Sequence, residues 1–345
     1  MRVLVAMSGG VDSSVAAALL IDEGHQVVGA TMKLWGGHSD SGCCSVADVE
    51  DARRVAQQLG IAHHVFNFTD DFDRDVVAPY VADHAAGVTP NPCVACNRHL
   101  KFDRFLHRAA QLGFDAAATG HHARIVPVGQ GRFQLRRGAD GPKDQSYVVH
   151  MLTQRQLARV LFPVGVLTKA EVRTRAAQLH LRTAEKPDSQ DVCFITRAGG
   201  RQAFLGERIP LHPGRVVEVG TNAPLGSVSA IELVTVGQRR GFGGFDPGSG
   251  RRYAVDVDVA TATVTLGRAA DLLTERLAVR DLGWVDGPVE PGRPVEVQSS
   301  AHGRPVPAVF GQDEVRFGEP QRRVAPGQSV VLYDGDVVLG GGVAA

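Results

Sequence analysis

Apolar runs alternate with helical patterns along the first half of this 345-residue chain. The strands that this pattern predicts cover residues 2–7, 26–32, 64–68 and 116–119. The apolar run 15–21 predicts a helix, and a second helix should run from Ser45, which has capping-box spacing to Asp48, to about Gly60. Alternating strands and helices predict a parallel sheet that is covered by helices.

The second half of the chain has a different pattern. Residues 124–128 and 132–135 flank Gly129-Gln130-Gly131 and predict a hairpin, and helical pattern follows from Asp144 to about Leu181. Beyond about residue 200, Pro, Gly and Val become frequent and short strands replace helices, at 215–219, 253–259, 294–297 and 329–333. We therefore expect an α/β domain (1–200), a small β-rich central domain (201–271) and a C-terminal β-barrel (272–345).

A glycine-rich loop, Ser8-Gly9-Gly10-Val11-Asp12-Ser13-Ser14, joins the first strand to the first helix. Glycines let the backbone approach an anion closely, and the amides at a helix start favour phosphate. The common phosphate loop ends in Gly-Lys-Ser/Thr, but the chain contains no Gly-Lys pair. The loop instead resembles the PP-loop (pyrophosphate loop) of ATP pyrophosphatases, which split ATP into AMP and pyrophosphate. A Rossmann-like PP-loop domain is therefore expected at the N-terminus.

Composition narrows the class of protein. The 37 basic and 37 acidic residues balance, which argues against a uniformly basic surface that would bind nucleic acid indiscriminately. No apolar run approaches the roughly 18 residues of a membrane span, so we expect a cytoplasmic protein with no membrane partner. The basic residues include five lysines, Lys33, Lys101, Lys143, Lys169 and Lys186. Because lysine is so rare here, these positions are candidates for sites that arginine cannot fill.

Two cysteine motifs lie nearly a hundred residues apart. The first runs from Pro90 to Arg98 and includes Cys93 and Cys96, and the second runs from Lys186 to Ile195 and includes Cys193. Together with the loop, they resemble the bacterial tRNA-specific 2-thiouridylases. Further segments that carry the resemblance are 42–45, 97–102, 119–121, 143–147, 162–165, 237–241 and 326–328.

The resemblance implies roles for the matching residues. Those expected to contact ATP are Ala6, Met7, Ser8, Gly9, Gly10, Val11, Asp12, Ser13, Met32 and Gly120. Those expected to contact the target base or the tRNA are Asn91, Pro92, Cys93, His121, Lys143, Asp144, Gln145 and Gln328. Cys193 is expected to carry a persulfide, with Cys96 as its partner thiol. The implied partners are tRNA, which the barrel should also contact, and a sulfur-donor protein, either a cysteine desulfurase or a relay.

The implied reaction converts a wobble uridine to 2-thiouridine. ATP with Mg²⁺ adenylates the 2-carbonyl, so that AMP becomes the leaving group, and the persulfide then attacks the carbon. Cys96 next attacks Cys193, which releases the sulfur to the base and leaves a disulfide bond for a reductant to reset. Lys186 and Arg98 are candidates for stabilising thiolates, with a plain surface role equally open.

The sequence leaves alternatives to this reaction. Many relatives have Asp where this chain has Cys93, so Cys93, Cys96 and Cys193 could instead hold a 4Fe-4S cluster that delivers sulfide. An amide-forming ATP pyrophosphatase would use the same loop but would not need the paired cysteines. The basic cluster Arg132, Arg136 and Arg137 either contacts tRNA phosphate or forms a solvated hairpin face.

Overall fold

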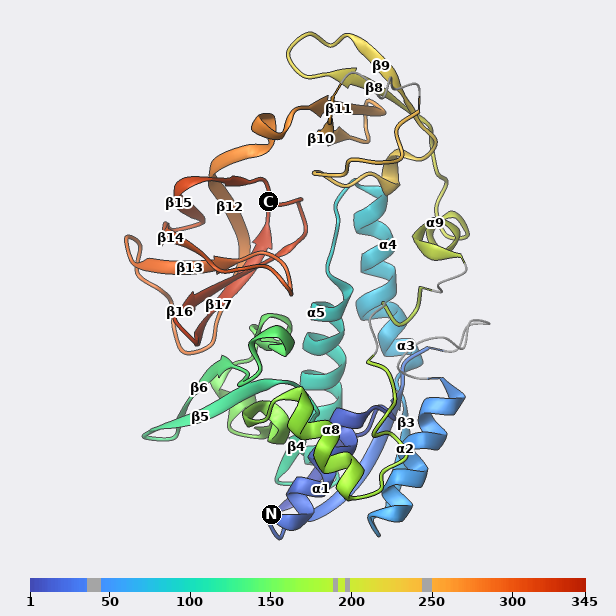
Figure 1. Ribbon diagram of the computed structural model, residues 1–345, viewed down its shortest axis with the longest axis vertical. Helices are drawn as coiled ribbons and strands as arrows, with labels where there is room; N and C mark the ends of the chain where they lie inside the picture. Colours follow the sequence, from blue (N-terminus) through green and yellow to red (C-terminus); the bar gives the residue numbers. More distant parts are fainter. Residues whose placement is uncertain (36–44, 189–191, 196–198, 244–249) are drawn as a thin grey trace.

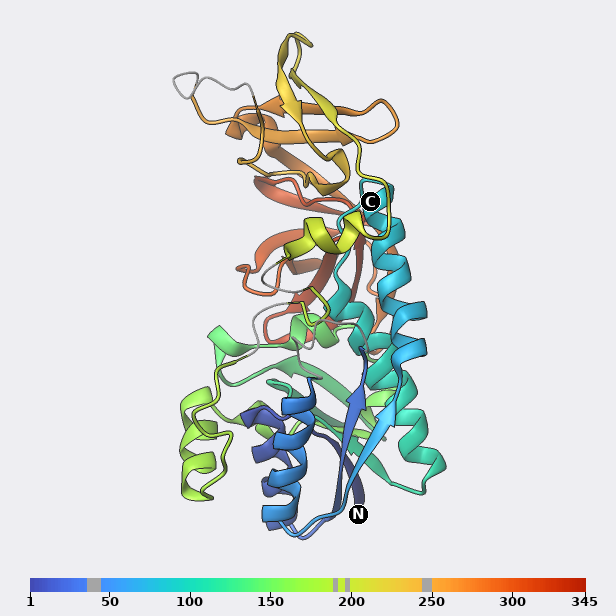
Figure 2. The same cartoon turned by 90° about the vertical axis from the view of Figure 1, so that its right-hand side faces the viewer.

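The computed structural model describes residues 1–35, 45–188, 192–195, 199–243 and 250–345. The molecule is elongated, with an N-terminal α/β domain at one end and a small β domain at the other (Figure 1). The barrel lies between them, beside two long helical rods, as the turned view in Figure 2 also shows. Among the described residues no helix is long and apolar enough to cross a bilayer.

A parallel sheet forms the centre of the N-terminal domain, and its described strands have the order β3-β2-β1-β4-β7. These strands are β1 (Arg2–Ala6), β2 (Gln26–Lys33), β3 (His63–Asn67), β4 (Ala116–Ala118) and β7 (Val160–Leu161). Alternate residues of β1 enter different cores: Val3 and Val5 pack under one layer of helices, Leu4 and Ala6 under the other. The sheet is therefore buried on both faces, as parallel sheets usually are.

Two helical layers cover this sheet. The helices on the Val3 side are α1 (Val11–Asp22), α2 (Val46–Gln58) and α8 (Lys169–Gln178). The other side carries the two rods, which are α3 (Thr69–Phe72), η1 (Asp73–Val77) and α4 (Ala78–Ala85), and α5 (Pro92–Cys96), η2 (Asn97–Phe105) and α6 (Leu106–Gln111). Short helices complete the domain: η3 (Gly141–Lys143), η4 (Ser146–Val149), α7 (Gln154–Leu157) and η5 (Pro163–Val166).

The central β domain follows α9 (Gly200–Gly206). Its described strands pair in the order β10-β11-β8-β9. Their bounds are β8 (Gly214–Glu218), β9 (Pro224–Val228), β10 (Tyr253–Asp258) and β11 (Thr263–Gly267), with η6 (Ile231–Leu233) beneath them. Val216, Ile231 and Leu266 are fully or almost fully buried and form a core separate from that of the parallel sheet.

The barrel begins after η8 (Ala269–Leu272). Six antiparallel strands of the described chain form a ring, β12-β15-β14-β13-β16-β17, which a β12–β17 pairing closes. They are β12 (Leu273–Trp284), β13 (Pro294–Gln298), β14 (Val306–Phe310), β15 (Glu314–Arg322), β16 (Ser329–Asp334) and β17 (Val337–Ala344). Val295, Phe310 and Leu332 are among the apolar side chains that fill its core.

A hairpin from the N-terminal domain reaches this barrel. It consists of β5 (Ala123–Gly129) and β6 (Arg132–Arg137), and Arg136 of β6 pairs with Val337 of β17. The basic cluster of the hairpin also contacts the barrel: Arg132 forms an ion pair with Asp286, and Arg136 forms one with Asp336 at 3.5 Å. Arg137 lies over the Tyr333 ring, with its guanidinium carbon 3.6 Å from the ring centroid. These arginines attach the hairpin to the barrel.

The predicted fold class is confirmed, with an N-terminal parallel sheet, a small β-rich domain and a β-barrel in that order. The capping box of Ser45 and Asp48 is also present at the start of α2. The main difference lies in residues 144–181, where the expected helical stretch is broken into short helices around β7. Pro163 and Gly165 interrupt the helical pattern there, and pairing with β4 orders the two-residue strand.

Candidate active site

The glycine-rich loop connects the carboxyl end of β1 to the first turn of α1. The Met7 amide donates to the Ala30 carbonyl at 2.8 Å, which keeps the loop on the sheet. Within the loop, the Ser8 amide donates to Ser13 Oγ at 3.2 Å, and the Ser14 hydroxyl donates to the Gly10 carbonyl at 2.8 Å. Gly10 is the N-cap residue of α1 and has no side chain to cover the first amides. The loop thus presents a helix start that is suited to an anion.

Two glycines allow neighbouring elements to close around this loop. Gly9 has a φ of +73°, and a Cβ there would lie 2.2 Å from the carbonyl oxygen of Asp48 in α2. Gly120, just after β4, leaves so little room that a Cβ would lie 2.6 Å from the Ser13 amide nitrogen. The first turn of α1 is therefore packed directly against the end of β4 and against α2. Such an edge, beyond the carboxyl ends of parallel strands, is where ligands of these sheets bind.

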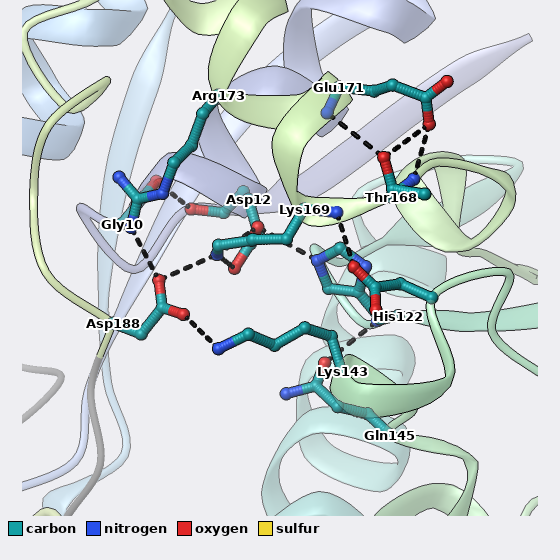
Figure 3. A network of polar contacts seen from close by, with 12 residues as sticks. Gly10, Asp12, His122, Lys143, Gln145, Thr168, Lys169, Glu171, Arg173 and Asp188 are labelled. Atoms are coloured by element: carbon teal, nitrogen blue, oxygen red, sulfur yellow. Dashed lines mark hydrogen bonds and ion pairs between the residues drawn. The ribbon is translucent and has the colours of Figure 1, made fainter.

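Asp12, in this first turn, is the start of a charged network (Figure 3). Lys169 Nζ at the start of α8 donates to both Asp12 carboxylate oxygens at 2.7 Å, and His122 Nε2 donates to Oδ1 at 3.1 Å. Burial raises the pKa of Asp12, but the hydrogen bonds from His122 and Lys169 outweigh it and lower that pKa overall. The loop carboxylate is therefore ionised and neutralised by a neighbouring cation.

Asp188 is the second anion of the network. It accepts from Lys143 Nζ at 2.8 Å and from Arg173 at 3.0 Å, and Lys169 Nζ lies 2.9 Å from its Oδ1 (Figure 3). Burial raises the pKa of Asp188, yet hydrogen bonds from Lys143 and Lys169 bring it down to about 2. Lys143, Lys169 and Arg173 thus form a cationic cluster around Asp188, and such cations suit a phosphate ligand.

Lys186 contacts both the glycine-rich loop and α2. Its Nζ donates to the Gly9 carbonyl at 2.9 Å, to Asp48 at 2.6 Å and to Asp51 at 2.7 Å. These three bonds use all three ammonium hydrogens. Through these bonds Lys186 joins its own segment to the glycine-rich loop, and its role toward a cysteine thiolate stays a prediction.

The two cysteine motifs lie on the rod side of the sheet. Asn91 is the N-cap residue of α5, and its Oδ1 accepts from the Cys93 and Val94 amides at 3.2 and 3.3 Å. Cys93 is exposed, whereas Cys96 is buried in the core of the rods. Cys193 is half-buried and packs against that same core. The intervening residues 189–191, and 42–44 of the earlier motif, lie outside the described residues.

The iron–sulfur alternative would use three cysteine thiols as ligands. Cys93, Cys96 and Cys193 all belong to the described part of the chain, and no three His, Cys, Asp or Glu residues within that part come together as a metal site. In a 4Fe-4S cluster each thiolate binds a different iron atom, so the thiols need not surround a single metal ion, and the iron–sulfur alternative stays a prediction. Mg²⁺ does not need a site built from protein ligands alone, because it is usually held by substrate phosphates with one or two carboxylates and arrives with ATP.

Comparisons with known proteins identify the family. Residues 1–197 match the model described as tRNA methyl transferase HUP domain, 202–268 the tRNA methyl transferase PRC-barrel domain, and 274–344 the aminomethyltransferase beta-barrel domain. The tRNA-specific 2-thiouridylase MnmA of Chloroflexus aurantiacus is 46% identical over 99% of this chain and 97% of its own length. That of Mycolicibacterium smegmatis is 48% identical over 98% of each. The chain belongs to the tRNA-specific 2-thiouridylase family.

A solved structure shows a more distant likeness. The U34-tRNA thiolase NcsA from Methanococcus maripaludis, with its iron–sulfur cluster, is 16% identical and has a TM-score of 0.37. The match covers 60% of this chain and 62% of that one.

The structure brings most of the expected ATP-contacting residues together at the edge of the sheet. Ala6 to Ser13 run from the end of β1 through the loop into the first turn of α1, Met32 lies near the end of β2, and Gly120 closes against the loop. Their contact with ATP stays a prediction. Lys169 was missed by sequence reasoning as a part of this site, and its rarity as a lysine was the one signal that could have indicated it.

The residues expected to contact tRNA differ in how exposed they are. Lys143 and Gln145 are partly or fully exposed, although Gln145 also accepts from the His122 amide at 2.9 Å. Asp144 has a side chain that is 7% exposed and accepts bonds from Arg137, Gly138 and Ser146. It therefore holds the turn together, and its buried carboxylate does not suit the expected direct contact.

His121 is also buried, against expectation. Its ring packs between Phe102 and Phe162, with both centroids 5.6 Å away, and Nδ1 lies 2.6 Å from Thr119 Oγ1. Burial and the positive charge of Lys101 lower the pKa of His121 well below its usual value. The imidazole is thus neutral and enclosed, and its expected contact with tRNA stays a prediction.

Gln328 contacts the segment that carries the first cysteine motif. Its Nε2 donates to the Thr89 carbonyl at 2.6 Å, and the Thr89 amide donates to the Pro326 carbonyl at 2.9 Å. Thr89 lies two residues before Asn91, so the barrel loop 326–328 positions the start of the Asn91–Cys93 stretch. A direct contact of Gln328 with tRNA stays a prediction.

Proposed function

We propose that this protein is a tRNA 2-thiouridylase, which activates the wobble uridine of its tRNA with ATP and replaces the 2-oxygen by sulfur. The observation that carries the proposal is the identity of 46–48% with 2-thiouridylases over nearly the whole chain. The glycine-rich loop, with the cationic cluster beside it, is consistent with a first step that consumes ATP. Like other enzymes that modify a stacked base, the protein would flip the uridine out of its stack.

In the first step, the uridine 2-oxygen attacks the α-phosphate of ATP, and pyrophosphate leaves. The loop amides, Ser8 and Ser13 would bind the phosphates, and Lys169 would offset their charge. Mg²⁺ enters with ATP as part of the substrate. The product is a uridine whose 2-oxygen is bonded to AMP, so that the oxygen now leaves with a good leaving group.

In the second step, the terminal sulfur of a Cys193 persulfide attacks the activated C2, and AMP leaves with the oxygen. The Cys96 thiolate then attacks Sγ of Cys193, breaking the bond to the transferred sulfur. This leaves 2-thiouridine and a Cys96–Cys193 disulfide, which an external dithiol reduces. The persulfide sulfur comes from a sulfur-donor protein, a cysteine desulfurase or relay. Support for these roles comes from Cys96 and Cys193 packing against one apolar core.

Activity with each cysteine variant tests this order of steps. Wild-type protein with tRNA, ATP and a persulfide donor should release AMP and pyrophosphate and form 2-thiouridine, as measured by nucleoside mass spectrometry. Cys193→Ser should still form AMP but no 2-thiouridine. Cys96→Ser should accumulate tRNA bound to Cys193 through the transferred sulfur, because the release step is missing. Thiolation that follows bound iron, and is lost in Cys93→Ala, would overturn the persulfide route.

A further inference from the structure

The segment that precedes Cys193 is tied to the glycine-rich loop. Lys186 donates to the Gly9 carbonyl, in the loop itself, and to Asp48 and Asp51 at the start of α2. One side chain thus connects the 186–193 segment with the two elements that enclose the proposed phosphate site. A tetrahedral ammonium can satisfy a carbonyl and two carboxylates at once, whereas the planar guanidinium of arginine has a different geometry.

Asp188 provides a second tie, two residues further on. It joins Lys169, which also binds Asp12 of the loop, and Lys143 (Figure 3). Arg173 reinforces the same stretch, because its guanidinium donates to the carbonyls of Ala184 at 2.7 Å and Lys186 at 3.1 Å. The backbone from 184 to 188 is therefore held by α8 on one side and by the loop on the other.

A third attachment lies directly after Cys193. Phe194 is 2% exposed, and its ring packs against Phe72, Tyr80 and Phe204, with centroids 5.0–5.6 Å apart. Cys193 is thus fixed between an ionic attachment at Asp188 and an aromatic one at Phe194. Five residues can span at most roughly 17 Å, so the ionic attachment limits how far Cys193 can lie from the ATP loop.

We propose that Lys186 and Asp188 are positioning residues that align Cys193 with the nucleotide activated at the glycine-rich loop. The inference rests on the proposed function, in which adenylation and sulfur transfer are separate steps at one site. Sulfur attack needs the persulfide within about 3.5 Å of C2, and a displacement of 1 Å can cost about 100-fold in rate. Loosening the segment therefore affects sulfur transfer more than adenylation.

The ratio of 2-thiouridine to AMP in the tRNA-dependent reaction measures how often adenylation is followed by sulfur transfer. Lys186→Met and Asp188→Asn should each lower the ratio by roughly tenfold, so that adenylate is formed and then lost to hydrolysis. Lys186→Arg should also lower it, because arginine cannot reproduce the three contacts. Arg175→Met is the matched control: it breaks an ion pair with Asp22 between α8 and α1, away from the loop, and should leave the ratio unchanged.

The outcomes separate this inference from the proposed function. If wild-type protein forms no AMP with tRNA, the proposed function fails. Suppose that the wild-type protein forms both AMP and 2-thiouridine. If Lys186→Met and Asp188→Asn then both keep the wild-type ratio of 2-thiouridine to AMP, whatever their total activity, the positioning role is overturned. Thermal unfolding of every variant shows whether it is folded, and the ratio itself does not depend on the fraction of active protein.

Discussion

The absence of a side chain at Gly120 determines the shape of the candidate ATP site. At Gly120 the backbone of the segment after β4 approaches the first turn of α1 so closely that a methyl group would lie 2.6 Å from the Ser13 nitrogen and 2.7 Å from the Asp12 carbonyl carbon. Both are backbone atoms, which cannot move aside without shifting the helix start. The glycine is thus required by packing, since its φ is not in the left-handed region.

Gly120→Ala should displace the first turn of α1. We expect a loss of about 1–3 kcal/mol in the free energy of unfolding, as for other overpacked sites, and a raised KM for ATP. Urea unfolding and ATP-dependent pyrophosphate release measure the two effects. Gly141→Ala is the control, because nothing lies within 4 Å of a Cβ there. Unchanged ATP kinetics in Gly120→Ala would contradict the packing argument.

The sequence indicated the loop residues but not the charges around them. Ser8 to Ser14 are contiguous in the sequence and therefore form a motif that can be recognised without the structure. Lys169 lies 157 residues from Asp12, and only the fold brings the two together. The burial of His121 between two phenylalanines likewise depends on the fold, since Phe102 and Phe162 lie far from it in the sequence.

At the scale of elements, a capping box sets the position of Lys169. Thr168 is the N-cap residue of α8, with its Oγ1 accepting from the Glu171 amide at 3.3 Å while Glu171 accepts from the Thr168 amide at 2.7 Å. Lys169 is the first residue of the helix, so its place beside Asp12 depends on where α8 begins.

Thr168→Ala should loosen this helix start. We expect a loss of about 1 kcal/mol, or roughly 2–4 °C in Tm, together with a raised KM for ATP because Lys169 is held less firmly. Thr153→Ala removes a comparable hydroxyl contact with Gln156 at the start of α7 and should cost stability without changing the KM. An equal change in KM for both variants would argue against a specific role of α8.

Elements of the N-terminal domain were easier to predict than those of the barrel. The strands of the parallel sheet are short apolar runs followed by helical pattern, which is a clear signal. The last strand, β17, contains Gly340, Gly341 and Gly342, residues that normally weaken a strand. A Cβ at these positions would lie 2.2–2.5 Å from carbonyl oxygens of β12 and β16, so close strand contact in the closed barrel requires the glycines.

At the scale of the whole molecule, the barrel approaches the segment between the two rods closely at Gly327. Gly327 has a φ of +89°, and a Cβ there would lie 2.4 Å from a Val88 methyl and 3.0 Å from the Thr89 carbonyl. Gln328 donates to that same carbonyl. The barrel thus contacts the chain just before Asn91, which couples its position to the first cysteine motif.

Gly327→Ala should push the barrel away from this segment. Gly335→Ala is the control: its φ is +59°, so it bears similar backbone strain, but nothing lies within 4 Å of its Cβ. We expect Gly327→Ala to be less stable than the control by about 1–3 kcal/mol. Trp284 fluorescence in a Trp35→Phe background follows the barrel, because these are the two tryptophans of the chain. Equal unfolding curves would show that the contact does not couple the parts.

The pairing of β6 with β17 has a consequence for the newly made chain. The hairpin leaves the ribosome about 200 residues before the strand that it joins, which at typical rates is a wait of roughly 10–40 s. Throughout that time one edge of β6 lacks its final partner and could pair with another chain. Pro127 and the arginines at 124, 132, 136 and 137 make the hairpin a poor template for such pairing. The same arginines that later attach the barrel would thus protect the nascent protein from aggregation.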